Sequence, residues 1–79
     1  MKIEILGTGC PKCQQLSSNV ERAVEELKIQ AEIVEVTDLN EIMNYGIMMT
    51  PGLAIDGQVK SAGKVLTGEE IKKLLTEEL

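Results

Sequence analysis

Residues 4–13 read EILGTGCPKC and contain both cysteines of the chain. An apolar run ends at Gly7, and apolar residues recur at three- and four-residue steps beyond the cysteines, so a strand is predicted to lead into a helix. Pro11 fits the first helical turn, where its missing N–H would have no intrahelical partner. Cys10 is therefore expected at or just before the N-terminus of this helix.

The first strand is expected over residues 2–6 and the second over residues 31–36. The second run has apolar residues at both odd and even positions, as in a strand whose two faces are at least partly covered. The helix between the two strands makes them parallel, through a right-handed crossover. Glu4 fits poorly inside a strand that would be central, and one explanation is that it faces a side covered only by a short helix.

A short helix is predicted to follow the second strand. Asp38 would begin it, with Glu41 as the partner in a capping box, and Gly46 is the candidate C-terminal stop. Its inward-facing residues are expected to be Leu39, Ile42 and Met43.

The last third of the chain predicts a hairpin and a helix. Asp56-Gly57 separates two short strand-like runs, 53–55 and 58–60, as in a tight antiparallel turn. Thr67 and Glu70 form a second capping box, followed by an apolar stripe that ends at Leu79. The expected order is βαβαββα, in one α/β domain that spans residues 1–79.

The composition narrows the classes of function. Thirteen acidic and eight basic residues give a net charge of −5, and the lysines are spread along the 79 residues, which argues against nucleic acid as a partner. No apolar run approaches the roughly 18 residues of a membrane span, and no signal peptide is recognised. The expected location is the cytoplasm, where thiols are normally reduced, so a purely structural disulfide is not expected.

A C-x-x-C pair at the start of a helix has a known chemistry. The free N–H groups and the positive end of the helix dipole stabilise a thiolate at Cys10, and Lys12 adds a positive charge beside it. Cys13, one turn later on the buried stripe, can attack a mixed disulfide formed at Cys10. Pro11 limits the freedom of the two-residue loop, so its substitution is expected to change the reduction potential.

Three features together resemble the thioredoxin fold in its minimal, glutaredoxin-like form: Cys-Pro-Lys-Cys after a strand, Thr50-Pro51 before a hairpin, and a closing helix. The whole chain is similar to small thioredoxin-like redox proteins of archaea and bacteria, including VTDLNEIMNYGIMMTP (36–51) and EEIKKLL (69–75). The resemblance implies a four-stranded mixed sheet in the order 2-1-3-4 with three helices. It also implies a cis Pro51 beside the disulfide, with Thr50 presenting backbone groups to an extended substrate.

The chain departs from the larger members of that family. Thioredoxins proper have a tryptophan where this chain has Gly9, and neither tryptophan nor phenylalanine occurs anywhere. Met48 and Met49 are interpreted instead as a soft apolar rim beside Pro51 that accepts varied protein substrates. Tyr45 is interpreted as a partly buried plug.

Glutathione-dependent glutaredoxins usually have a glycine pair and an acidic residue after the hairpin. This chain has Lys60-Ser61-Ala62-Gly63-Lys64 there, so glutathione dependence is not expected, although Lys12 and Lys60 or Lys64 could meet a carboxylate.

We therefore predict a monomeric dithiol–disulfide oxidoreductase that acts on protein disulfides. Cys10 is the expected nucleophile and Cys13 the resolving thiol. No cofactor is expected besides their redox-active disulfide, and the partners would be protein substrates and an unidentified reductase. The alternative is a protein that binds or transfers Cu(I) or Zn through the same two thiolates. The helix predicted over 38–46 and the unexplained Thr50-Pro51 weigh against that alternative.

Overall fold

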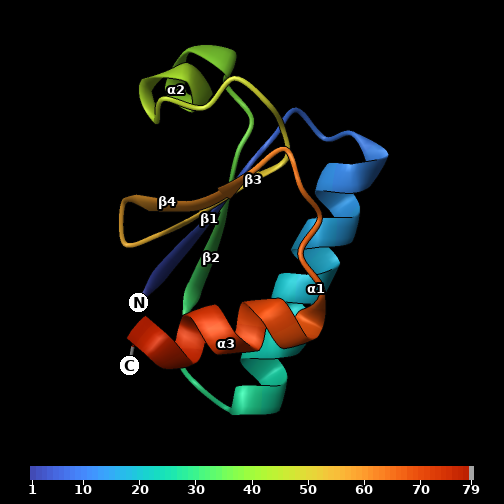
Figure 1. The fold of residues 1–79 in the computed structure, drawn as a ribbon, viewed down its shortest axis with the longest axis vertical. Coiled ribbons are helices and arrows are strands. Elements are labelled where there is room, and N and C mark those ends of the chain that lie inside the picture. Colours follow the sequence, from blue (N-terminus) through green and yellow to red (C-terminus); the bar gives the residue numbers. More distant parts are fainter. Residues whose placement is uncertain (79) are drawn as a thin grey trace.

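The computed structural model describes residues 1–78, and its elements follow the predicted order βαβαββα (Figure 1). The elements are β1 (Lys2–Leu6), α1 (Pro11–Leu27), β2 (Glu32–Val36), α2 (Leu39–Asn44), β3 (Gly52–Ile55), β4 (Gln58–Ala62) and α3 (Gly68–Glu78). The fold class predicted from the sequence is confirmed, whereas the expectation for Leu79 lies outside the described residues.

The four strands form one mixed sheet in the order β2-β1-β3-β4. β1 is parallel to β2 and antiparallel to β3, and β3 and β4 are antiparallel, as predicted. The parallel pairing continues past β1, because Gly7 donates its N–H to the carbonyl of Val36 at 3.0 Å. The cysteine-bearing loop therefore leaves the sheet from one of its two central strands.

The hairpin is longer than predicted, because β4 continues to Ala62. Leu53 pairs with Ser61 while the next residue, Ala54, pairs with Val59, so Lys60 is an extra residue in β4. Such a bulge bends the strand locally without ending it. The sequence carries no glycine or proline at this place that would have indicated the bulge.

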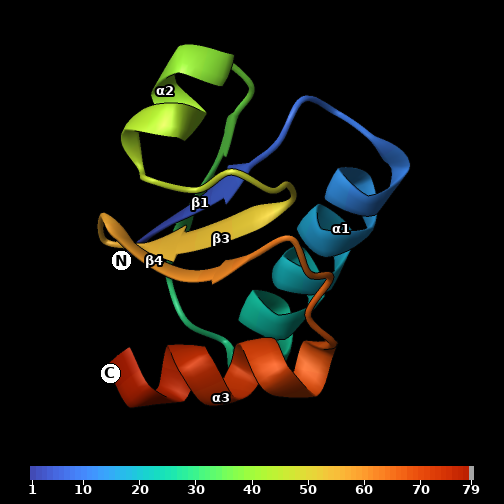
Figure 2. The same ribbon diagram turned by 45° about the horizontal axis from the view of Figure 1, so that its top comes forward.

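The sheet has a separate apolar cluster on each face. Figure 2 shows α2 on one side of the sheet and α1 and α3 on the other. On one face, α1 and α3 cover Ile3, Ile5, Leu53 and Ile55 with the side chains Leu16, Val20, Ala23, Ile71 and Leu75. On the other face, α2 and the loop after it cover the sheet with Ile42 and Ile47, which cluster with Leu6, Val36 and Ala54. The second cluster is smaller, so α2 is held by fewer buried side chains.

The prediction that Leu39 and Met43 face inward is wrong. Both are exposed, and only Ile42 of α2 is buried. A helix of six residues makes fewer than two turns, so it presents little more than one side chain to the sheet. Ile47, in the loop that follows, supplies the second buried side chain instead.

The helix ends follow the predicted capping signals in part. At α3, Thr67 and Glu70 form both halves of the capping box, with each backbone N–H donating to the other side chain at 3.2 Å. At α2, Asp38 accepts the N–H of Asn40 at 2.8 Å and that of Glu41 at 3.4 Å. Among the described hydrogen bonds, those of the capping box at α2 are only the ones that the Asp38 side chain accepts, so this box is half formed.

Glu4 lies on the α2 face of β1, as the sequence had suggested. It is only 7% exposed, and its carboxylate accepts a hydrogen bond from the hydroxyl of Tyr45 at the end of α2. Tyr45 packs partly buried against the cluster of Ile42 and Ile47. The tyrosine thus closes the α2 face and satisfies the acid of the central strand.

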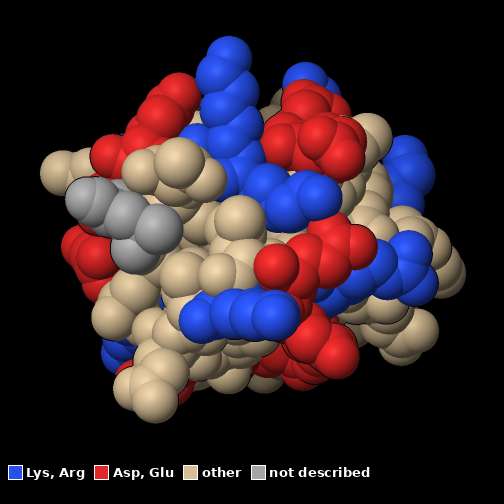
Figure 3. Space-filling model, turned by 90° about the horizontal axis from the view of Figure 1, so that it is seen from below, with Lys and Arg blue, Asp and Glu red and all other residues tan. Residues whose placement is uncertain are grey.

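Positive and negative side chains alternate on the side of the molecule that carries α3 (Figure 3). Lys72 of α3 pairs with Glu26 of α1 at 2.7 Å and with Glu69 at 3.4 Å. Such exposed pairs contribute little to stability, so the two helices are held mainly by their apolar contacts. Within residues 1–78 we find no helix with the length and apolar character needed to span a membrane.

Candidate active site

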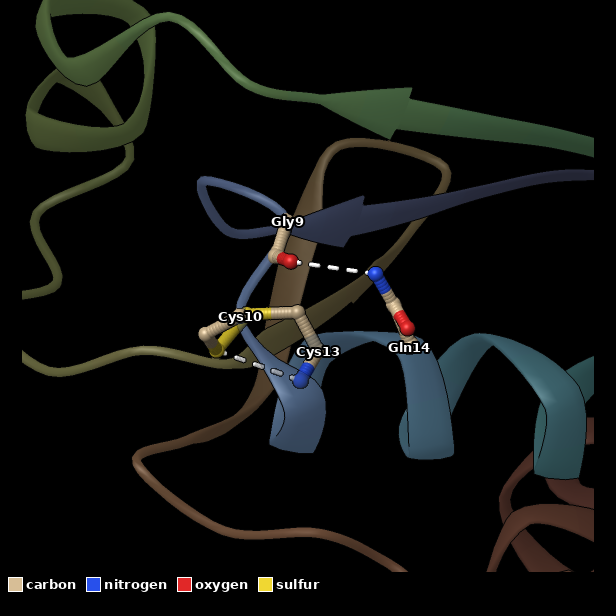
Figure 4. The surroundings of a disulfide bond; sticks show 4 residues. All are labelled: Gly9, Cys10, Cys13 and Gln14. Carbon is tan, nitrogen blue, oxygen red and sulfur yellow. Dashed lines mark hydrogen bonds between the residues drawn. A yellow bond between two sulfur atoms is a disulfide. The ribbon is translucent and has the colours of Figure 1, made fainter.

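Cys10 and Cys13 form a disulfide at the N-terminus of α1, with their Cα atoms 5.1 Å apart (Figure 4). Cys10 is the N-cap of the helix and has an extended backbone. Its Sγ accepts the backbone N–H of Cys13 at 3.2 Å, and its carbonyl accepts that of Gln14 at 3.0 Å. The sulfur therefore takes the place of the side-chain oxygen that usually caps a helix.

The two sulfurs differ in access. Cys10 is half-buried at the tip of the loop, whereas Cys13 is 5% exposed and lies on the buried stripe of α1. Pro11 and Lys12, between them, are exposed in the first turn. A partner approaching from solvent therefore meets Cys10 before Cys13.

Gly7 makes room for the disulfide. A Cβ atom at Gly7 would overlap Cys13 Sγ and would lie 3.1 Å from Cys13 Cβ. The same position is 4.0 Å from the Cα of Pro51, so the disulfide, the end of β1 and the Pro51 loop meet here. The sequence alone does not mark Gly7, because a glycine that ends a strand is also common in simple turns.

The Thr50–Pro51 peptide bond is cis, as the family resemblance implies. Pro51 is buried, and its carbonyl accepts the N–H of Gly63 at 2.8 Å, which ties the loop to the end of β4. Thr50 and Met49, just before it, are exposed. Thr50 and Met49 thus face solvent, while Pro51 is held beside Gly7 and the disulfide.

Methionines surround this loop. Met48 is 98% exposed and Met49 is 65% exposed, in agreement with the rim expected from the sequence. Met49 lies against Gly63, since a Cβ at Gly63 would be 2.9 Å from Met49 Cβ. Met48 borders an apolar groove of about 460 Å³, which is also lined by Leu39, Ile42, Met43, Gly46, Ile47 and Thr50.

Gln14 is a second residue that the sequence did not reveal. Its side chain turns back from α1 and donates to the carbonyl of Gly9 at 3.2 Å (Figure 4). Gly9 has φ of +87°, a conformation that favours glycine, so the bond fixes a loop that only this residue type adopts easily. A cavity of about 100 Å³ lies behind the disulfide, lined by Gly7, Gly9, Cys13, Gln14, Ile5, Glu35 and Thr37.

Two of the lysines considered as partners for a substrate carboxylate are already paired. Lys60 lies 2.6 Å from Glu78, and Lys64 lies 3.2 Å from Glu70. A glutathione carboxylate at either lysine would therefore compete with an internal carboxylate. Of the three lysines, Lys12 is the one placed in the first turn of α1, between the cysteines.

The fold strongly changes the ionisation of Tyr45. The hydrogen bond to Glu4, followed by burial and the negative charge of that carboxylate, raises the pKa of Tyr45 to about 12. The tyrosine therefore stays protonated near neutral pH and acts here as a hydrogen-bond donor. This is consistent with the plug role expected from the sequence.

The fold and the site together define a class of protein. A four-stranded mixed sheet carries a C-x-x-C disulfide at a helix N-terminus beside a cis-proline, and these are the features of a thiol–disulfide oxidoreductase with a thioredoxin fold. A family model described as a thioredoxin domain matches residues 1–76. The chain belongs to the thioredoxin family.

Two relatives bear the name thioredoxin, and both come from archaea. The thioredoxin of Methanothermobacter thermautotrophicus is 47% identical over 76 residues, which cover 96% of this chain and 99% of the relative. The thioredoxin of Methanocaldococcus jannaschii is 55% identical over 73 residues, which cover 92% of this chain and 84% of the relative. The similarity to small archaeal redox proteins, noted from the sequence, is confirmed.

Proposed function

We propose that the chain reduces or exchanges disulfides of protein substrates through its Cys10-Pro11-Lys12-Cys13 motif. The observation that carries this proposal is the position of Cys10, a half-buried N-cap sulfur that accepts a helix N–H and belongs to the disulfide that meets the cis Thr50–Pro51 loop at Gly7. Donors at a helix N-terminus lower the pKa of a cysteine thiol, which makes the thiolate available near neutral pH.

The reaction begins with both cysteines reduced. The Cys10 thiolate attacks one sulfur of a substrate disulfide, the substrate S–S bond breaks, and the second substrate sulfur leaves as a thiolate. Cys13, once deprotonated, attacks Cys10 Sγ and breaks the mixed disulfide. Two electrons have then passed to the substrate, which leaves as a dithiol, and the protein is left with the Cys10–Cys13 disulfide.

The surroundings of the disulfide suggest how a protein substrate is held. Thr50 and Met49 are exposed next to buried Pro51, so an extended substrate segment can lie along this loop with its cysteine at Cys10. An unidentified reductase would return two electrons to the disulfide after each turnover. The cytoplasmic location and the monomeric state expected from the sequence stay predictions.

Trapping of mixed disulfides tests the assigned roles. Cys13→Ser should accumulate covalent complexes with protein substrates, because the mixed disulfide at Cys10 can no longer be resolved. Cys10→Ser, the matched control, should accumulate none. Non-reducing electrophoresis followed by mass spectrometry reads the result, and trapping through Cys13 in the control variant would refute the assignment.

A redox titration tests the activity itself. The protein is equilibrated in dithiothreitol buffers and alkylated, and its mass is measured by mass spectrometry. Fluorescence cannot report the redox state of the cysteines, because the protein has no tryptophan. A two-electron transition between roughly −200 and −300 mV is expected, within the span of known exchangers. A dithiol that forms no reversible disulfide but binds Cu(I) or Zn tightly would favour metal transfer instead.

A further inference from the structure

Two methionines line the apolar groove next to the proposed substrate loop. Met43 of α2 is 66% exposed and Met48 is 98% exposed, and both border the groove together with Thr50. Methionine commonly fills cores, yet these two thioethers face solvent. The groove therefore presents its apolar surface in a form that a solvent oxidant can reach.

The disulfide between the two cysteines leaves the methionine thioethers as the sulfur atoms open to oxidation. Cys10 and Cys13 are joined in the oxidised protein, and no free cysteine exists among the described residues. A mild oxidant that would attack a thiolate thus finds none. The sulfur atoms it can reach are thioethers, and Met48 is the most exposed of them.

We propose that Met43 and Met48 form a modification site for hydrogen peroxide, and that their oxidation weakens the binding of protein disulfides. The sulfur of the thioether attacks one peroxide oxygen, the O–O bond breaks, and the sulfur gains that oxygen as a sulfoxide. The sulfur loses two electrons, and the other oxygen leaves as water after proton transfer. Methionine sulfoxide reductases reverse this modification.

The consequence for activity follows from the polarity of the product. A sulfoxide is polar, so two of them replace apolar surface of the groove with groups that favour water. A protein substrate that lies along Thr50–Pro51 would lose apolar contact there, whereas a small disulfide that reaches only Cys10 would not. This part of the inference rests on the proposed function.

Peptide mapping by mass spectrometry tests the site without any assay of activity. The disulfide form is exposed to limiting hydrogen peroxide, quenched and digested. Met48 and Met43 should each gain one oxygen before Met1, which serves as an internal control because it is half-buried against the α1 and α3 cluster. Oxidation of Met1 ahead of Met48 would overturn the proposal.

Steady-state kinetics test the effect on substrate binding. Peroxide-treated protein is reduced with dithiothreitol and assayed on insulin and on a small aromatic disulfide. The KM for insulin should rise about fivefold, as expected for the loss of part of one apolar contact, while the constants for the small disulfide stay the same.

Both proteins in this assay carry Met49→Leu, because Met49 is 65% exposed beside Thr50 and its oxidation would add to the effect. The further changes Met43→Leu/Met48→Leu give the matched control, since leucine keeps the groove apolar and cannot form a sulfoxide. Each protein is compared with itself before and after peroxide, so the control's own KM does not matter. The KM of the control should not change on treatment. An equal rise in the control, or no rise in the protein that keeps Met43 and Met48, would refute the regulatory effect.

The outcomes separate this inference from the proposed function. If untreated protein reduces neither disulfide, the proposed function fails, and the regulatory effect fails with it. The order of oxidation at Met48, Met43 and Met1 would still decide whether the modification site exists.

Discussion

Gly7 allows Cys13 to lie directly over the end of β1, because glycine has only a hydrogen atom where other residues have a Cβ. Because a Cβ there would overlap Cys13 Sγ, Gly7→Ala must displace either the disulfide or the strand. We expect the variant to lose about 1–3 kcal/mol of stability, the usual cost of overpacking a core, and to show an altered reduction potential. Denaturant unfolding and redox titration of the variant measure the two effects.

Gly68→Ala is the matched control for that variant. Gly68 lies at the start of α3, and nothing is within 4 Å of a Cβ placed on it. Alanine favours helix more than glycine does, so Gly68→Ala should be neutral or slightly stabilising, by up to about 1 kcal/mol. An equal loss of stability at Gly7 and Gly68 would argue against the close contact with Cys13.

Tyr45 offers a second test at the scale of one residue, because it is the only aromatic side chain. Its pKa is raised to about 12 in the folded protein, against about 10 for a free tyrosine. Between these values the folded state holds the proton more tightly than the unfolded state does. The stabilising effect is therefore complete below about pH 10 and is lost as the pH rises toward 12.

Tyrosinate absorbance during an alkaline titration measures this pKa without interference from other chromophores. Glu4→Gln should bring the pKa of Tyr45 back toward its ordinary value, because the amide keeps a hydrogen-bond acceptor but removes the negative charge. A native tyrosine that titrates near 10 would show that the bond to Glu4 is absent in solution.

At the scale of elements, α1 makes the two cysteines chemically different. Cys10 caps the helix and is half-buried, whereas Cys13 is buried one turn further on. In the reduced protein we expect Cys10 to react with iodoacetamide at least about tenfold faster than Cys13 at neutral pH, because the helix N-terminus favours its thiolate. Mass spectrometry after timed quenching identifies which cysteine is labelled, and equal rates would remove the case for an activated Cys10.

Among the elements, the turn between β3 and β4 and the start of α3 are the easiest to predict from the sequence. Asp56-Gly57 and the Thr67–Glu70 pair are local signals, and each forms the turn or cap that it predicts. The contacts of Gly7 with Cys13 and of Glu4 with Tyr45 could not be foreseen in the same way. They join residues from different elements, and neither residue pair has a spacing that marks it in the chain.

The wrong prediction for Leu39 and Met43 of α2 has the same cause, because burial in a helix depends on contacts with other elements. The apolar pattern of α2 predicted three inward side chains, but whether a helical residue is buried depends on how much sheet surface lies opposite. On this face the sheet also carries Glu4, and the loop residue Ile47 fills the place that a longer helix would cover. The exposed Leu39 and Met43 are therefore available at the groove, and the local pattern alone does not show this.

Over the whole molecule, the larger apolar cluster and the proposed substrate groove lie on opposite faces of the sheet. The α1 and α3 face carries the larger apolar cluster, and the α2 face carries the groove with Met48 and Thr50. Regions with few buried apolar contacts open at lower free energy than the core does. The element that borders the proposed substrate groove should therefore also be the first helix to open.

Native-state hydrogen exchange tests this directly. The amides of Ile42, Tyr45 and Gly46, which are bonded within α2 or to its end, should exchange through local opening with little dependence on denaturant. The bonded amides of β1 and β3, the two central strands, should exchange only on global unfolding. Equal free energies and equal denaturant dependence for the two sets would mean that α2 is an integral part of the cooperative core. In that case the groove beside Thr50 would be a rigid surface, and protein substrates would have to fit it as it stands.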